Sequence, residues 1–249
     1  MSLLNLAKKV FSILRSEGSS KYPAEATGQD IDCLKYCSPY TMTSEARLYA
    51  TLQSVKYVVN NQIDGDFVEC GVWRGGNSMI MAKTLANLGI TNRDLYLYDT
   101  FEGMTPPSGV DMDGSGRSAQ SLLKNTPKSE GSNIWCIASM DDVAANISST
   151  GYPSERIHLV KGDVKKTLES DCNIPKNISL LRLDTDWYES TKIELETLFP
   201  RLATGGVCLI DDYGHWQGAR RAVDEYLSEY KLFPLIHVTD YTGRAFIKP

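Results

Sequence analysis

Apolar residues along this chain fall into two alternating patterns. Short apolar runs that are typical of buried strands occupy residues 67–71, 95–98, 157–160, 178–183 and 207–210. Stretches with apolar residues at helical spacing lie between or after them, at residues 77–88, 164–168, 188–202 and 218–230. Because strand and helix alternate at the spacing of βαβ units, we expect an α/β fold with a doubly wound, mostly parallel sheet that helices cover on both faces.

The first part of the chain shows helical patterns without strands. Its early apolar residues recur at helical spacing, as Leu3, Leu6, Val10, Ile13 and Leu14. Residues 43–60 form a second helical pattern, with Thr43 or Ser44 as its N-cap. We therefore predict an N-terminal helical extension over residues 1–60, whose first helix packs on the domain or on a second subunit. No apolar run approaches the ~20 residues of a membrane-spanning helix, so we expect no membrane partner.

Residues 103–135 interrupt the alternation. The stretch is rich in Gly, Pro, Ser and Asp, and such long excursions from compact domains are often lids over a site. It contains Asp111-Met112-Asp113-Gly114, which is similar to the start of a calcium-binding loop. The twelfth position of that loop requires glutamate but holds Leu122, so we reject a calcium site. Residues 235–238 and 245–247 predict a terminal hairpin, and the chain fits one domain over residues 1–249.

Composition narrows the choice of partners. The 249 residues carry 26 basic and 31 acidic side chains, a net charge of −5, without a basic stripe. Because binding to nucleic acid is driven by clustered Lys and Arg, we expect no nucleic-acid partner. The six cysteines are dispersed and form no zinc-binding set: Cys33, Cys37, Cys70, Cys136, Cys172 and Cys208. This usage favours a reducing compartment, and we expect a cytoplasmic protein.

Acidic residues mark the carboxyl ends of the predicted strands, where ligands of doubly wound sheets bind: Glu69, Asp99, Asp163, Asp184 and Asp211. The first of them opens the motif ECGVWRGG at residues 69–76, which lacks the GxGxxG of a dinucleotide site. Its acid would repel a pyrophosphate but suits the ammonium group of S-adenosylmethionine; the alternative is a plain strand-to-helix turn. Asp99 lies 28 residues after Gly71, a spacing that suits the ribose hydroxyls of a nucleoside, although a helix cap is the alternative.

A second acidic group suggests a metal. Asp184 ends one predicted strand, Asp186 follows it, and Asp211 and Asp212 end the next strand. Carboxylates that meet at adjacent strand ends repel one another, and a divalent cation relieves the repulsion. Ligands that are all oxygen suit magnesium, calcium or manganese rather than zinc. Two readings stay open here: Asp186 acts as a base outside the ligand sphere, or one or two aspartates merely cap helices. His215 either lines an acceptor pocket or is incidental.

The chain contains FVECGVWRGGNSMIMAK, LYLYDTFEGM, LLRLDTDWYEST and PRLATGGVCLIDDYGHWQGARRAVDEY. These stretches resemble the macrocin O-methyltransferase family, whose members act on macrolide and aminocoumarin sugars. The similarity runs from about Thr41 to about Tyr226. It implies a class I, Rossmann-like methyltransferase fold, S-adenosyl-L-methionine as methyl donor, Mg²⁺ dependence and a homo-oligomer.

The resemblance also implies roles for single residues. The metal ligands of the family fall on Asp184, Asp211 and Asp212, and its general base falls on Asp186. Its cofactor contacts fall on Thr41, Glu69, Cys70, Gly71, Val72, Trp73, Asp99, Thr100, Phe101, Glu102, Gly103 and Asp163. The acceptor is expected near Tyr188 and His215, under a variable substrate lid at residues 103–135.

These roles give a hypothesis for the reaction. The acceptor is a small hydroxylated molecule, a glycosylated metabolite, whose neighbouring hydroxyls bind the cation while Asp186 takes the proton of the hydroxyl to be methylated. A phenolic or polysaccharide acceptor satisfies the same chemistry. Asp184-Thr185-Asp186 is also the DxD motif of a metal-dependent glycosyltransferase, an alternative that the turn at residues 69–76 and the pair Asp211-Asp212 disfavour.

Overall fold

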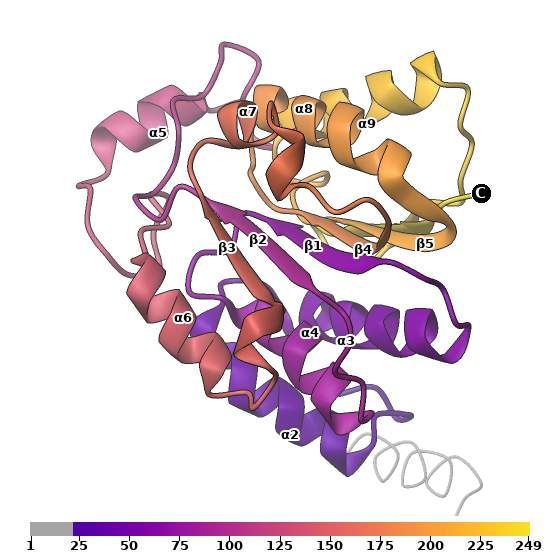
Figure 1. Ribbon diagram of the computed structural model, residues 1–249. Helices are drawn as coiled ribbons and strands as arrows, with labels where there is room; N and C mark the ends of the chain where they lie inside the picture. Colours follow the sequence, from indigo (N-terminus) through magenta and orange to yellow (C-terminus); the bar gives the residue numbers. More distant parts are fainter. Residues whose placement is uncertain (1–21) are drawn as a thin grey trace, which may run out of the picture.

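The structure, a computed structural model, describes residues 22–249, so the helix predicted over residues 1–18 lies outside the described residues. Its centre is a seven-stranded sheet with the strand order β3-β2-β1-β4-β5-β7-β6 (Figure 1). The strands are β1 (Asp66–Cys70), β2 (Leu95–Asp99), β3 (Ile157–Lys161), β4 (Ile178–Leu183), β5 (Leu202–Ile210), β6 (His237–Val238) and β7 (Arg244–Ile247). The first five pair in parallel, and β7 is antiparallel to both β5 and β6.

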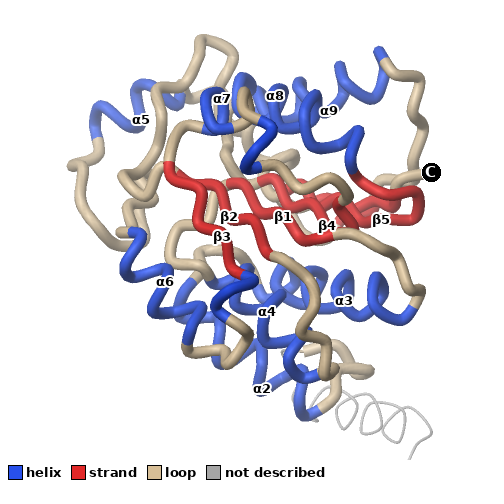
Figure 2. Tube along the Cα trace, in the orientation of Figure 1, coloured by secondary structure: helices blue, strands red, loops and turns tan. Residues whose placement is uncertain are grey.

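Helices cover both faces of the sheet (Figure 2). One face carries α2 (Gly28–Cys37), α3 (Glu45–Asn60), α4 (Gly76–Asn87) and α6 (Met140–Ser148). The other carries α7 (Val164–Thr167), α8 (Tyr188–Leu198) and α9 (Gln217–Glu229). Each set of helices buries its apolar side against the sheet in a separate core, one containing Leu52 and Ile80 and the other Leu195 and Val223. The predicted doubly wound α/β fold is therefore confirmed.

Two predicted boundaries on β5 and α8 are wrong. The strand expected over residues 207–210 begins earlier, because β5 already starts at Leu202. Gly205 has a φ of +80°, and the register with β4 is irregular over this stretch, so the glycines form a bulge inside the strand rather than a turn. The helix expected over residues 188–202 ends at Leu198, because Pro200 lies in a 3₁₀ turn, Phe199–Arg201.

The chain before β1 contains two helices in its described part. Sequence patterning predicted α3, whose N-cap is Ser44: its hydroxyl accepts a hydrogen bond from the amide of Arg47 at 3.2 Å. It missed α2, which begins with a capping box between Thr27 and Asp30. Across residues 22–249, no helix is long and apolar enough to cross a membrane.

Residues 103–135 leave the sheet after β2 and contain the helix α5 (Ala119–Asn125), which the sequence analysis did not predict (Figure 1). This segment docks on the starts of α8 and α9 through a small apolar cluster that includes Ala119, Trp187 and Trp216. The indole nitrogen of Trp187 also donates a hydrogen bond to the carbonyl of Thr105 at 2.9 Å. The segment therefore lies packed beside the carboxyl ends of the strands.

Candidate active site

A cavity opens at the carboxyl ends of the central strands, the edge at which the sequence places its acids. Most of the candidate residues line it: Thr41, Glu69, Gly71, Val72, Trp73, Asp99, Thr100, Gly103, Asp163, Asp184, Asp186, Asp211, Asp212 and His215. Parallel strands bring these ends together although the residues are far apart in the chain. The fold thus gathers most of the expected site in one place.

Four candidate residues point elsewhere. The side chain of Cys70 is buried in the core beneath α7, α8 and α9, and Phe101 is buried in the core on the other face. Glu102 is exposed and pairs with Lys161. The hydroxyl of Tyr188 donates to Glu225 at 2.7 Å on the surface. Their side chains do not line the cavity, because neighbouring residues of a strand or turn project in different directions.

The turn after β1 depends on glycine. Gly71 has a φ of +82°, and a Cβ on this residue would lie 1.9 Å from the carbonyl oxygen of Asp184. Gly75, with a φ of +89°, is the N-cap of α4, and one of the three residues between the two glycines, Trp73, has a φ of +46°. At Gly71 only glycine avoids both the strain of this φ and a clash with the end of β4. The motif therefore places the backbone of the turn directly against Asp184. A plain strand-to-helix turn does not need such a close approach.

Asp99 holds this turn in place. Its carboxylate accepts hydrogen bonds from the amides of Val72 at 2.7 Å, Trp73 at 3.0 Å and Phe101 at 2.8 Å. Burial raises the pKa of Asp99, although the three amides oppose that shift. Asp99 therefore caps no helix but ties the end of β2 to the glycine turn.

Three carboxylates form a cluster that is suited to a cation. One oxygen from each of Asp184, Asp186 and Asp212 lies within 4.8 Å of the others. Burial and the neighbouring carboxylates raise the pKa values of Asp184 and Asp212 well above their usual range, and raise that of Asp186 to about 7. An all-oxygen set that is so unfavourable when charged fits a hard divalent cation such as Mg²⁺.

Asp211, which the resemblance places among the ligands, lies outside this cluster. Its carboxylate forms ion pairs with Arg47 and Arg182, one on each oxygen. The structure therefore brings together Asp184, Asp186 and Asp212, a grouping that differs from the expected set of Asp184, Asp211 and Asp212.

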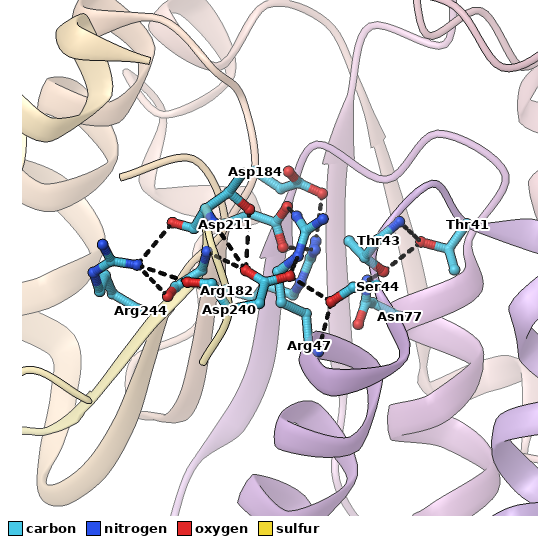
Figure 3. Close-up of polar contacts among 12 residues, drawn as sticks. Thr41, Thr43, Ser44, Arg47, Asn77, Arg182, Asp184, Asp211, Asp240 and Arg244 are labelled. Atoms are coloured by element: carbon cyan, nitrogen blue, oxygen red, sulfur yellow. Dashed lines mark hydrogen bonds and ion pairs between the residues drawn. The ribbon is translucent and has the colours of Figure 1, made fainter. Parts of the chain in front are cut away.

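Arg182 is one of the residues that sequence reasoning missed (Figure 3). It projects from β4 with only 2% of its side chain exposed, and its guanidinium donates to Glu69 at 2.8 Å, to Asp184 at 2.6 Å and to Asp211. A buried arginine is stable only when it is paired. An arginine inside the apolar run LLRLD was the available signal for such a partner among the acids.

Arg47 extends this ion-pair network to the C-terminal hairpin (Figure 3). It pairs with Asp211 and, at 2.9 Å, with Asp240. Asp240 in turn accepts a hydrogen bond from Ser44 at 2.5 Å, at the start of α3. The start of α3 and the hairpin loop are thereby fixed against the acidic end of the cavity, and Thr242 of that loop lines it.

Comparison with known proteins defines the class. The chain has the fold of class I O-methyltransferases: it is similar to the structure of the O-methyltransferase NovP, with a TM-score of 0.72 and 28% identity over 84% of this chain and 82% of that one. The sequence profile of the family Macrocin-O-methyltransferase (TylF) matches residues 5–248, and the chain belongs to this family. It is thus an enzyme that methylates oxygen, and the glycosyltransferase alternative is wrong.

Two relatives are similar over most of the chain. The 8-demethyl-8-(2,3-dimethoxy-alpha-L-rhamnosyl)-tetracenomycin-C 4'-O-methyltransferase of Streptomyces olivaceus is 34% identical over 82% of this chain and 74% of its own length. The demethyldecarbamoylnovobiocin O-methyltransferase of Streptomyces niveus is 30% identical over the same shares, 82% and 74%.

Proposed function

We propose that this chain is an S-adenosylmethionine- and Mg²⁺-dependent O-methyltransferase that acts on one hydroxyl of a vicinal diol, in the sugar of a secondary metabolite. The observation that carries the proposal is the cluster of Asp184, Asp186 and Asp212 in the same cavity as the glycine turn at residues 71–75. The acceptor class is supported by a relative that is named for a rhamnosyl derivative of tetracenomycin C. The residues 103–135 are proposed to cover this acceptor.

The cofactor end of the cavity is built by the glycine turn. Val72 and Trp73 line it, with their amides held by Asp99. Asp99 is proposed to offer its remaining lone pairs to the ribose, and Asp163, the N-cap of α7 after β3, is proposed to contact the adenine. Glu69 lines the same wall, but its two oxygens already accept hydrogen bonds from Arg182 and Ser78. S-adenosylmethionine, when bound, supplies an electrophilic methyl group.

The acidic end is proposed to hold the cation. Asp184 and Asp212 belong both to the expected ligand set and to the cluster, so we assign them to Mg²⁺. Each oxygen of Asp211 forms an ion pair, with Arg47 or with Arg182, and we propose that Asp211 supports the site through this network. A bound Mg²⁺ lowers the pKa of an acceptor hydroxyl that coordinates it.

We assign Asp186 as the general base that accepts the proton of that hydroxyl. It has a φ of +66°, a conformation that is costly for aspartate and turns its carboxylate toward Asp184 and Asp212. An acceptor hydroxyl at the cation would therefore lie beside this carboxylate. Cys136 and His215 line the same cavity, and we propose that they face the rest of the diol.

Methyl transfer from labelled S-adenosylmethionine tests the proposal, with rhamnosides, catechols and polysaccharides as alternative acceptors. We expect Mg²⁺-dependent labelling of a rhamnoside. In Asp186→Asn, turnover should fall about 10²–10⁴-fold, the usual contribution of a general base. Cofactor affinity in this variant, measured by calorimetry, should stay unchanged. Wild-type turnover of Asp186→Asn would remove the residue from this role, and labelling of catechols alone would overturn the sugar acceptor. A homo-oligomer and a cytoplasmic location stay predictions.

A further inference from the structure

A buried glutamate lies next to the candidate active site and has no part in the reaction described above. Glu194 belongs to α8, on the face of the sheet that also carries α7 and α9 (Figure 1), and its side chain is 0% exposed. It lies close to the thiols of Cys70 and Cys208, whose pKa values are raised by burial and by this carboxylate. Both thiols belong to the apolar core of that face, so Glu194 is an acid inside an apolar core.

No cation compensates this acid. In the part of the chain that the structure describes, Glu194 forms no ion pair, and its Oε2 atom has no hydrogen-bond partner. Burial raises the pKa of Glu194 well above its usual range, a hydrogen bond from Thr185 opposes this shift, and the charges of Asp212 and Asp163 add to it. A buried polar group that is only half satisfied costs stability, and an apolar side chain of similar volume would cost less. Packing alone therefore does not explain Glu194.

The one hydrogen bond of Glu194 reaches into the acidic cluster. Its Oε1 atom accepts from the hydroxyl of Thr185 at 2.8 Å. Thr185 lies between Asp184 and Asp186 in the chain, and it lines the catalytic cavity. Its carbonyl also accepts a hydrogen bond from the amide of Trp187 at 2.8 Å. Side chain and backbone of Thr185 are thus both held in place, the side chain by Glu194.

Asp186 needs such support. Its φ of +66° is costly for a residue with a side chain, so the surrounding structure has to hold it there. In this conformation one of its oxygens lies within 4.8 Å of oxygens of Asp184 and Asp212, and repulsion between the carboxylates favours a movement away from them. We propose that Glu194 is a positioning residue: through the hydroxyl of Thr185 it holds Asp186 beside Asp184 and Asp212. This inference rests on the proposed function, because the residue that is held is the proposed general base.

Kinetics of variants on both sides of this hydrogen bond test the inference. Glu194→Met replaces the carboxylate by an apolar side chain of similar length, and Thr185→Val removes the hydroxyl but keeps the shape. With saturating cofactor, Mg²⁺ and rhamnoside, kcat should fall about 10-fold to 100-fold in each, since a reacting group that is misplaced by about 1 Å can lose that much. The KM for S-adenosylmethionine should stay unchanged. Glu194→Gln keeps an acceptor oxygen for Thr185 and should stay within about threefold of the wild-type kcat.

The double variant shows whether the two residues act through one contact. Glu194→Met/Thr185→Val should have the kcat of the worse single variant, because a shared hydrogen bond can be lost only once. Thr167→Val is the matched control, since the Thr167 hydroxyl is buried on the neighbouring helix α7 without a hydrogen-bond partner, and its kcat should equal that of the wild type. Wild-type kcat in Glu194→Met, an equal loss in Glu194→Gln, or losses that multiply in the double variant would each overturn the inference.

Hydrogen exchange of the Trp187 amide, read by NMR, tests the contact without any turnover. Loss of one ordinary hydrogen bond should accelerate this exchange about 2-fold to 13-fold in Glu194→Met and in Thr185→Val, but not in Glu194→Gln or Thr167→Val. Unchanged exchange in Glu194→Met would overturn the inference. If exchange accelerates as expected but the wild type transfers no methyl group, the role of Glu194 in holding the segment is retained and the proposed function is refuted. If neither is seen, both are refuted.

Discussion

Asp111 is expected to hold residues 103–135 against the catalytic helices, and Asp111→Asn tests this. One carboxylate oxygen accepts from the amide of Tyr188 at 2.8 Å, and the other accepts from the amide and hydroxyl of Ser108 at 2.6 and 2.7 Å. Gly218 of α9 lies so close that a Cβ there would be 1.9 Å from Asp111 Oδ1. An asparagine has only one acceptor oxygen, so its NH₂ group must face a backbone N–H donor on one side.

The magnitude follows from these contacts. A buried N–H without an acceptor costs about 1–3 kcal/mol. Loss of the negative charge at the start of α8 costs about 0.3–1 kcal/mol more, since the N-terminus of a helix favours an anion. The segment should therefore be held more weakly by about 1.3–4 kcal/mol, which increases its opening about 10-fold to 800-fold.

Hydrogen exchange of α5, read by mass spectrometry, measures this opening. Exchange in Ala119–Asn125 should accelerate by that factor in Asp111→Asn. Asp113→Asn is the control, because Asp113 is equally buried but its carboxylate accepts only from Ser115 and Arg117, inside the same segment. Wild-type exchange in Asp111→Asn, or the same acceleration in both variants, would refute the reasoning.

Three further changes probe the site itself. Mg²⁺ at 100 times its dissociation constant should raise the free energy of unfolding by about 2.7 kcal/mol, as a thermal-shift titration measures. Asp212→Asn should abolish this gain. An equal gain in the variant would exclude Asp212 as a ligand. Gly71→Ala forces a Cβ toward the carbonyl of Asp184 at a φ of +82°, and it should lower the free energy of unfolding in urea by about 3 kcal/mol or more. Gly28→Ala is the control, because a Cβ there meets nothing within 4 Å and should cost little. Equal losses in the two variants would contradict the role of the turn. Arg182→Met should destabilise the chain by about 3–5 kcal/mol in the same assay, because it leaves buried carboxylates unpaired; a loss below about 1 kcal/mol would show that the network is not needed for folding.

Local patterns were sufficient for much of the fold. The alternation of apolar runs and helical spacing located β1 to β5 and the helices α3, α4, α8 and α9, because burial on one or both faces leaves a period in the sequence. The patterns missed α2, α5 and α6, which are short or carry polar residues on much of their surface. They also missed the first residues of β5, since a glycine with positive φ, Gly205, forms a bulge inside that strand.

The sequence by itself determined that acids would meet at the carboxyl edge of the sheet, because strand ends and parallel connections are encoded locally. Only the tertiary structure decided how these acids are sorted. Asp186 joins Asp184 and Asp212, whereas Asp211 turns to Arg182 and to Arg47, which lies 164 residues away in the chain. Likewise, 77 residues separate Asp111 from the amide of Tyr188 that it holds. Which side chains pair depends on the directions in which they point from helices and strands that pack together. The spacing of residues along one segment of the chain does not give these directions.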